Sequence, residues 1–316
     1  MSPQVTEGVI DPYAPASGND GYVVEHYGLD IRYKSRTNRL EGVATIKLHA
    51  TKNLRNLSFD LVGLRAERIS VNGAKFKGFA QSSAKLTLKL PEPVEAGTPL
   101  DVVIDYAGAP MSRKTRWGEV GWELLSDGVM VAAQPSGAPT WFPCNDHPSN
   151  KATFDIRVST DRRYTVVCNG TLDSVQTQGQ SRLWHYTQAE PTATYLATMV
   201  VGKLERRTKR LAGVEVTYAY PKTIESRVLH DLDETPEMLS FFSEAFGPYP
   251  FTDYTVVVTE DDLEIPLESQ NLATFGANHM DGSRSWNRLV AHELAHQWFG
   301  NSVGLYRWQD IWLNEG

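Results

Sequence analysis

The chain has 316 residues, of which 41% are hydrophobic and 22% are charged, values ordinary for a globular protein long enough for two domains. Its formal net charge of -7 argues against a nucleic-acid-binding protein, which usually carries a basic surface. The two cysteines are too few for a disulfide framework and favour a reducing compartment.

The N-terminus lacks the features of a targeting segment. The first twenty residues, MSPQVTEGVIDPYAPASGND, contain neither the basic start nor the apolar core of a signal peptide. Nowhere does the sequence hold an apolar run long enough to span a membrane. We therefore expect a cytoplasmic protein without a membrane or nucleic-acid partner.

From about residue 22 to residue 204, short stretches alternate apolar and polar residues, the pattern of half-buried strands. Turn signals separate them, including Asn72-Gly73 and the proline-rich segment 91–99. The stretches with this pattern are 28–33, 42–50, 57–61, 85–90, 101–106, 151–160 and 164–170. They predict an N-terminal antiparallel β domain of saddle or sandwich type, which we place at residues 1–205.

The pattern changes near residue 206, where a second domain is expected over residues 206–316. Residues 214–221 predict one more strand, and a helical spacing of apolar residues then continues until Gly247 and Pro248. The apolar residues with this spacing are Val228, Leu229, Leu232, Leu239, Phe242 and Phe246. The chain as a whole is therefore predicted to be mainly β, followed by an α+β part.

Two further elements are predicted before the end of the chain. Residues 254–262 favour a strand followed by acidic residues. Residues 285–299 favour a helix, and Ser283 or Ser285 has the side chain that an N-cap needs.

This last predicted helix carries His292, Glu293 and His296 in the pattern H-E-x-x-H. Residues i and i+4 lie one turn apart on the same face, so the two imidazoles can bind one cation. Glu293 lies about 100° around the helix from His292 and can accept a proton from a metal-bound water. Nitrogen ligands in a catalytic site with an open position indicate zinc.

Glu315 offers the third protein ligand that a catalytic zinc ion needs. Eighteen residues separate it from His296, enough for a turn at residues 300–302 and a second helix carrying RWQDIWLNEG. Each feature alone has a simpler explanation, because H-E-x-x-H occurs by chance in helices and a late glutamate can be a surface charge. Their joint occurrence favours the metal interpretation.

HELAHQWFGN followed by WLNEG resembles the signature of the gluzincin zinc aminopeptidases, the family of aminopeptidase N and leukotriene hydrolase. The resemblance implies an N-terminal saddle-shaped β domain followed by a thermolysin-like catalytic domain, of which residues 206–316 would be the first part. It implies an enzyme that removes N-terminal residues from peptides by attack of a metal-activated water. His292, His296 and Glu315 would bind Zn²⁺, and Glu293 would be the catalytic base.

The resemblance also implies a residue that binds the free N-terminus of the peptide substrate. The family carries a G-x-M-E-N segment on an edge strand before the first zinc histidine. IPLESQN, residues 265–271, takes that place here, with Glu268 as the motif glutamate and with Ile, Leu and Ser as departures. A carboxylate is the group that an α-ammonium requires. Glu264 is the alternative anchor, and an acidic loop is the structural alternative.

A third expectation from the resemblance concerns Gln134. The family has Gln or Glu nine residues before the proline of an F-P-C-x-D-x-P stretch, and QPSGAPTWFPCNDHP places Gln134 there. It would help to hold the first substrate residue, although a buried turn around Cys144 also explains this stretch. We do not expect His147 to be a metal ligand.

In the family the catalytic domain continues beyond W-L-N-E-G and supplies a tyrosine that stabilises the oxyanion, and no residue of this sequence matches that tyrosine. We therefore expect these 316 residues alone to bind zinc weakly or not at all and to have negligible peptidase activity. The alternatives are a zinc endopeptidase without an amine anchor, an added epoxide-hydrolase activity, and a non-catalytic binding module.

Overall fold

The computed structural model describes residues 11–116 and 118–316. Residues 1–10, for which the sequence predicts no signal peptide, lie outside the described part. None of the helices in the described ranges is long and apolar enough to cross a membrane.

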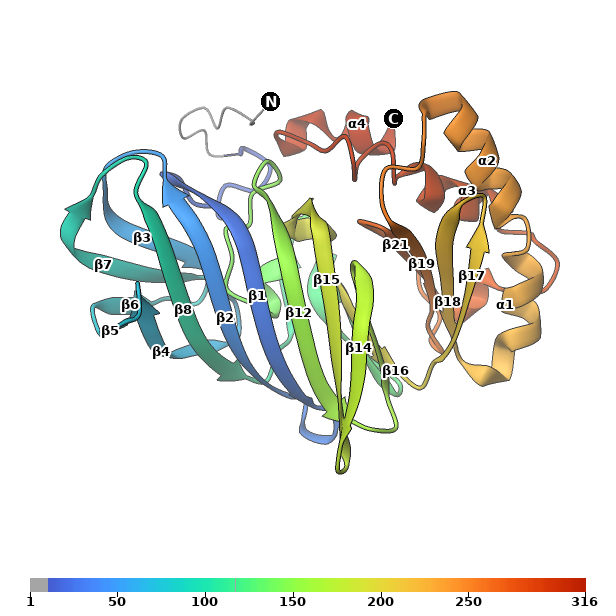
Figure 1. The fold of residues 1–316 in the computed structure, drawn as a ribbon, viewed down its shortest axis with the longest axis horizontal. Coiled ribbons are helices and arrows are strands. Elements are labelled where there is room, and N and C mark those ends of the chain that lie inside the picture. Colours follow the sequence, from blue (N-terminus) through green and yellow to red (C-terminus); the bar gives the residue numbers. More distant parts are fainter. Residues whose placement is uncertain (1–10, 117) are drawn as a thin grey trace.

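The largest layer is an eight-stranded sheet in the order β14-β15-β12-β1-β2-β8-β4-β5 (Figure 1). Its strands are β1 (Tyr22–Lys34), β2 (Arg39–Ala50), β4 (Arg65–Val71), β5 (Ala74–Phe76), β8 (Pro99–Gly108), β12 (Lys151–Asp161), β14 (Thr171–Gln178) and β15 (Ser181–Ala193). Neighbouring strands are antiparallel except β1 and β12, which run parallel. The predicted antiparallel domain therefore contains one parallel pair, which the long connection between β1 and β12 makes possible.

Two smaller sheets complete the N-terminal domain. One has the order β13-β16-β11-β10-β9 and the other the order β3-β7-β6. Their strands are β3 (Leu54–Asp60), β6 (Phe79–Gln81), β7 (Lys85–Val94), β9 (Ser112–Thr115), β10 (Gly118–Leu125), β11 (Gly128–Ala132), β13 (Thr165–Cys168) and β16 (Met199–Gly202). Strand β7 includes Pro91 and Pro93, which the sequence places in a turn at residues 91–99. The strand tolerates them because a register shift in its pairing with β3 leaves both prolines without a paired residue.

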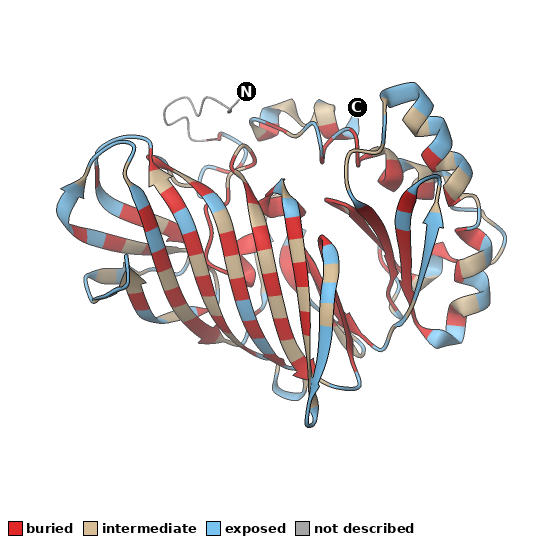
Figure 2. Cartoon of the chain, in the orientation of Figure 1, coloured by how far each residue is buried: buried red, intermediate tan, exposed pale blue. Residues whose placement is uncertain are grey.

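Burial explains why these segments are strands. Every second residue of β12 is buried, and the same alternation follows the large sheet in Figure 2. The buried faces of all three sheets share one hydrophobic core. The predicted alternation and the mainly β fold class are therefore confirmed.

The second part of the chain has one mixed sheet in the order β17-β18-β19-β21-β20. Its strands are β17 (Glu205–Leu211), β18 (Val214–Tyr220), β19 (Asp253–Val258), β20 (Leu267–Ser269) and β21 (Leu272–Phe275). One face packs against the helices α1 (Glu225–Asp231), α2 (Thr235–Phe246) and α3 (Asn287–Ala295). The opposite face packs against the β13-β16-β11 sheet through a cluster that includes Met130, Val200 and Val257.

Two helix predictions need correction. The long helix expected before Gly247 is two helices, because Pro236 lacks an N–H and lies in the first turn of α2. Neither serine caps α3, whose N-cap is Trp286 without a side-chain bond. The hydroxyl of Ser283 bonds instead to Asp281 and Ser285.

The helix expected to carry RWQDIWLNEG is also shorter than predicted. The segment contains a 3-10 turn over Trp308–Asp310 and the single-turn helix α4 (Trp312–Glu315). Figure 1 places α4 between the N-terminal sheets and the helices of the second domain. Glu315 therefore lies on a short turn between the two parts of the molecule.

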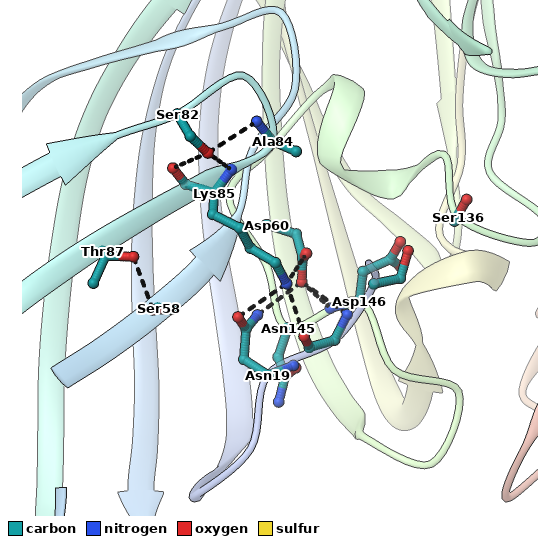
Figure 3. Close-up of polar contacts among 12 residues, drawn as sticks. Asn19, Ser58, Asp60, Ser82, Ala84, Lys85, Thr87, Ser136, Asn145 and Asp146 are labelled. Carbon is teal, nitrogen blue, oxygen red and sulfur yellow. Dashed lines mark hydrogen bonds and ion pairs between the residues drawn. The ribbon is translucent and has the colours of Figure 1, made fainter. Parts of the chain in front are cut away.

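A buried polar centre lies inside the N-terminal domain (Figure 3). Asp60 is 1% exposed and accepts bonds from Lys85 Nζ at 2.5 Å, Asn19 Nδ2 at 2.8 Å and the Asp146 amide at 3.1 Å. Asp146 accepts a bond from the hydroxyl of Thr194 at 2.8 Å. Burial and the nearby Asp60 carboxylate raise the pKa of Asp146 to about 7.

Candidate metal centre and substrate site

Helix α3 positions the H-E-x-x-H residues. Its apolar side chains Val290 and Leu294, with Trp298 just beyond, are buried in the core of the second domain. The same helix places His292 and His296 one turn apart, with their Nε2 atoms 2.9 Å from each other. His296 is 3% exposed, whereas the His292 side chain is 45% exposed. One ligand is therefore fixed inside the protein and the other faces the opening.

Glu315 approaches both rings from α4. Its Oε2 atom lies 3.6 Å from His292 Nε2 and 3.9 Å from His296 Nε2. Burial and the adjacent His296 lower the pKa of His292, which favours the neutral imidazole that binds metals. The structure thus brings together the three residues expected to hold zinc.

These three residues fit a zinc ion. A tetrahedral ion about 2.0–2.1 Å from each ligand keeps neighbouring ligand atoms roughly 3.4 Å apart. The observed separations of 2.9, 3.6 and 3.9 Å bracket that value. Two imidazoles and one carboxylate are also the donor set of catalytic zinc sites with a position left for water.

Glu293 lies beside this group with its carboxylate buried. It is 3% exposed, and its Oε2 atom has no hydrogen-bond partner among the described residues. Burial, followed by the charges of Glu268 and Glu315, raises its pKa well above the usual value. A carboxylate with a raised pKa and a free oxygen can accept a proton near neutral pH.

Glu268 lies on β20, the edge strand of the second sheet. Ligand atoms of Glu268, Glu293 and His296 all lie within 4.8 Å of one another. Burial raises the pKa of Glu268, while His296 and a hydrogen bond from Asn314 lower it. Glu264, the alternative anchor, is exposed and belongs to neither group of potential ligands.

Gln134 follows β11, the strand whose sheet packs against the second domain. Within the described residues, no hydrogen bond or ion pair joins Gln134 to the metal centre. Its Oε1 atom is buried and has no partner in the described part of the chain. This oxygen is therefore an unused hydrogen-bond acceptor, and the role of Gln134 stays a prediction. His147 bonds to Ser149 and belongs to neither ligand group.

Sequence reasoning missed two residues that hold this site together. Asn314 is 5% exposed, and its Nδ2 atom donates to Glu268 Oε1 at 2.9 Å and Glu315 Oε1 at 3.2 Å. Gly300 has φ of +103°, and a Cβ added there would lie 1.6 Å from Asn314 Oδ1. Asn314 stands next to a predicted ligand, but no spacing rule indicates that its amide reaches a strand 46 residues away.

The chain is similar to known peptidases. The model of the Peptidase M1 N-terminal domain matches residues 23–196, and that of the Peptidase family M1 domain matches residues 230–316. Human endoplasmic reticulum aminopeptidase 1 is 26% identical over all of this chain, and Xenopus laevis leukotriene A-4 hydrolase is 27% identical over 92% of it. The chain spans 36% and 49% of the length of these two relatives.

A solved structure has the same fold. It is an M1 zinc metallopeptidase mutant from Deinococcus radiodurans bound to a Tyr-Ser-Ala substrate, with a TM-score of 0.88 and 30% sequence identity. The similarity covers 97% of this chain and 71% of that one.

Proposed function

The chain belongs to peptidase family M1, and from this premise we propose that its residues form the metal centre and amine-binding site of a zinc-dependent aminopeptidase. One observation carries the proposal. Two groups of potential ligands, one with His292 and Glu315 and the other with Glu268 and Glu293, share the buried His296. The metal-binding half of the site (His292 and Glu315) and its acidic half (Glu268 and Glu293) therefore meet at His296.

The residues have separate roles. His292, His296 and Glu315 would hold the ion. When bound, the ion would act as a Lewis acid and would lower the pKa of a water molecule on it. Glu293 does not belong to that triad, and its buried Oε2 atom has no hydrogen-bond partner within residues 11–116 and 118–316. It accepts the proton of the attacking water and later delivers it to the leaving nitrogen.

The acidic half accounts for a preference for free N-termini. Glu268 offers a partly buried carboxylate on an edge strand, where a peptide α-ammonium can form charge-assisted hydrogen bonds. Gln134 offers a second acceptor from the N-terminal domain. Peptides with an unblocked N-terminus are therefore the proposed substrates.

The test compares Tyr-Ser-Ala with its N-acetylated twin, at high protein concentration and with zinc supplied. We expect the free-amine peptide to be cleaved about 10- to 100-fold faster, because acetylation removes an ion pair worth about 1.5–3 kcal/mol. Glu268→Gln should remove most of this difference, whereas Glu264→Gln, a change at an exposed glutamate, should leave it intact.

Other outcomes would favour the alternative functions. Equal cleavage of both peptides would indicate a zinc endopeptidase. Binding of zinc and peptide without cleavage of either would indicate a non-catalytic binding module. No specific feature of the described residues favours either alternative.

Two finer proposals concern the chain by itself. We propose that these 316 residues hold zinc weakly and turn over peptides slowly, because the side chains of His292 and Glu315 are 45% and 41% exposed to competing water. Measuring bound zinc after dialysis tests this, and a tightly held stoichiometric ion would refute it.

We also propose a cytoplasmic location, supported by the free and buried Cys144 and Cys168. Finding the protein in an oxidising compartment in cell fractions would contradict it.

A further inference from the structure

We propose that the N-terminal domain holds the third metal ligand in place through Lys151, Tyr195 and Asp11. The proposal rests on the metal centre of the proposed function. It concerns residues 300–316, here named the ligand segment, which carry Glu315. Lys151, Tyr195 and Asp11 act as positioning residues, because the ligand triad does not include them.

The two parts of the metal centre pack on different cores. The histidine helix α3 is buried against the second domain through Val290, Leu294 and Trp298. The ligand segment instead contributes Leu305 and Trp308 to a separate cluster with Ala14, Ala193, Tyr195 and Leu196 of the N-terminal domain. The distance between Glu315 and the histidines therefore depends on how the N-terminal domain holds this segment.

Lys151 provides the first contact. It begins β12, and its Nζ atom donates hydrogen bonds to the carbonyl oxygens of Asn301 at 2.7 Å and Ser302 at 2.9 Å. No salt bridge of Lys151 occurs among the described residues, so these carbonyls are its main polar partners. The contact ties the N-terminal domain to the turn that leads from α3 into the ligand segment.

Tyr195 provides the second contact. Its buried hydroxyl donates to the carbonyl oxygen of Gly300 at 3.1 Å. Its ring packs edge-on against Trp308, with the ring centroids 4.8 Å apart. One side chain thus holds both the start and the middle of the ligand segment.

Asp11 provides the third contact from the other end of the chain. It is 2% exposed, and its Oδ2 atom accepts a hydrogen bond from the Trp308 amide at 2.6 Å. Its Oδ1 atom accepts a bond from the Tyr13 amide at 2.8 Å, which fixes the carboxylate itself. The segment is therefore held at residues 300–302 and 308, before it reaches Glu315.

This arrangement couples domain docking to metal binding. If the N-terminal contacts preorganise Glu315, their loss weakens zinc binding while the His292–His296 pair stays intact on α3. The coupling is reciprocal, so bound zinc should in turn protect the contacts made by Asp11 and Tyr195.

The experiment uses Lys151→Met, which keeps an unbranched side chain as far as the ε position and removes the ammonium. Lys47→Met, at an exposed lysine on β2 of the same sheet, is the matched control. Tyr195→Phe is a milder second variant that removes only the hydroxyl. Zinc affinity is measured by competition with a chelator, and hydrogen–deuterium exchange is measured without metal. Lys151→Cys treated with bromoethylamine restores a side-chain ammonium and serves as a rescue.

We expect Lys151→Met to raise the zinc Kd about tenfold and to speed exchange in residues 300–316 but not in α3. Tyr195→Phe should change both quantities in the same direction, whereas Lys47→Met should change neither the zinc Kd nor the exchange rate. The chemical rescue of Lys151→Cys should lower the Kd again. Unchanged exchange and unchanged Kd in both Lys151→Met and Tyr195→Phe would overturn the proposal. If the unmodified chain bound zinc too weakly to measure, or bound it away from His292, His296 and Glu315, the exchange result alone would decide this proposal. Only the second outcome would contradict the metal assignment of the proposed function.

Discussion

The side-chain amide of Asn314 donates a hydrogen bond to Glu268 Oε1 at 2.9 Å, although the two residues are 46 positions apart. The same nitrogen donates to Glu315 Oε1 at 3.2 Å. One buried amide therefore lies between the proposed amine anchor and the proposed third metal ligand. It also supplies hydrogen atoms between two carboxylates that would otherwise repel each other.

Asn314→Ala should weaken both zinc binding and peptide binding. Both carboxylates lose a donor, and loss of such an orienting group typically costs about 10- to 100-fold in metal affinity. Zinc is measured by chelator competition, and Tyr-Ser-Ala binding by calorimetry in a Glu293→Gln background. Gln309→Ala, at an exposed amide of the same segment, is the control. If Asn314→Ala kept the wild-type affinities for zinc and peptide, the hydrogen bonds from Asn314 to Glu268 and Glu315 would not be needed for binding.

Gly300→Ala should displace Asn314. Gly300 has φ of +103°, and the added Cβ would lie 1.6 Å from Asn314 Oδ1. Gly247→Ala is a matched control, because Gly247 has φ of +100° but no atom within 4 Å of an added Cβ. Both variants carry backbone strain of about 1–3 kcal/mol, and only Gly300→Ala should also lose zinc affinity. Equal zinc affinity in the two variants would contradict the proposed contact.

Glu293→Gln should retain zinc and lose at least about 100-fold in peptide turnover, because the variant removes the proposed base. It should also be more stable at pH 7 than the wild type. Burial raises the pKa of Glu293, so the ionised carboxylate costs folding free energy above its ordinary pKa. Urea unfolding and peptide hydrolysis measure the two effects. A variant with turnover within tenfold of the wild type would show that Glu293 is not the base.

Asp146 should make stability depend on pH. Its folded pKa is about 7 against an ordinary value of 3.8, so between these values the folded state binds more protons than the unfolded state. The free energy of unfolding should therefore fall as pH rises through this window, by up to about 1.4 kcal/mol per pH unit. In Asp146→Asn this contribution is absent, although the side-chain oxygen can still accept the Thr194 bond. Urea unfolding at pH 5 and pH 7.5 tests this, and an equal change in both proteins would contradict it.

Much of the architecture could be predicted because local patterns determine it. The alternation in β12 reports one buried and one exposed face, and the helical spacing of His292 and His296 reports a shared face. The break before Pro236 was missed although proline is a local signal for a helix start, because the apolar spacing continues across it. The start of α3 was missed because its N-cap, Trp286, makes no side-chain cap bond that a sequence pattern could indicate.

The supporting contacts of the site could not be predicted from spacing. Lys151, Tyr195 and Asp11 reach the ligand segment from three distant parts of the chain. No periodicity or motif links a lysine at the start of β12 to the backbone carbonyls of Asn301 and Ser302. Such contacts follow from how the two domains dock, which is a property of the complete fold.

His292, His296 and Glu315 are proposed to bind one zinc ion together. Anomalous diffraction at the zinc absorption edge, from crystals grown with zinc supplied, tests it most directly. We expect one strong peak about 2.0–2.2 Å from the two Nε2 atoms and a Glu315 carboxylate oxygen. A peak elsewhere, or a structure in which Glu315 points away from the histidines while zinc is bound, would contradict it.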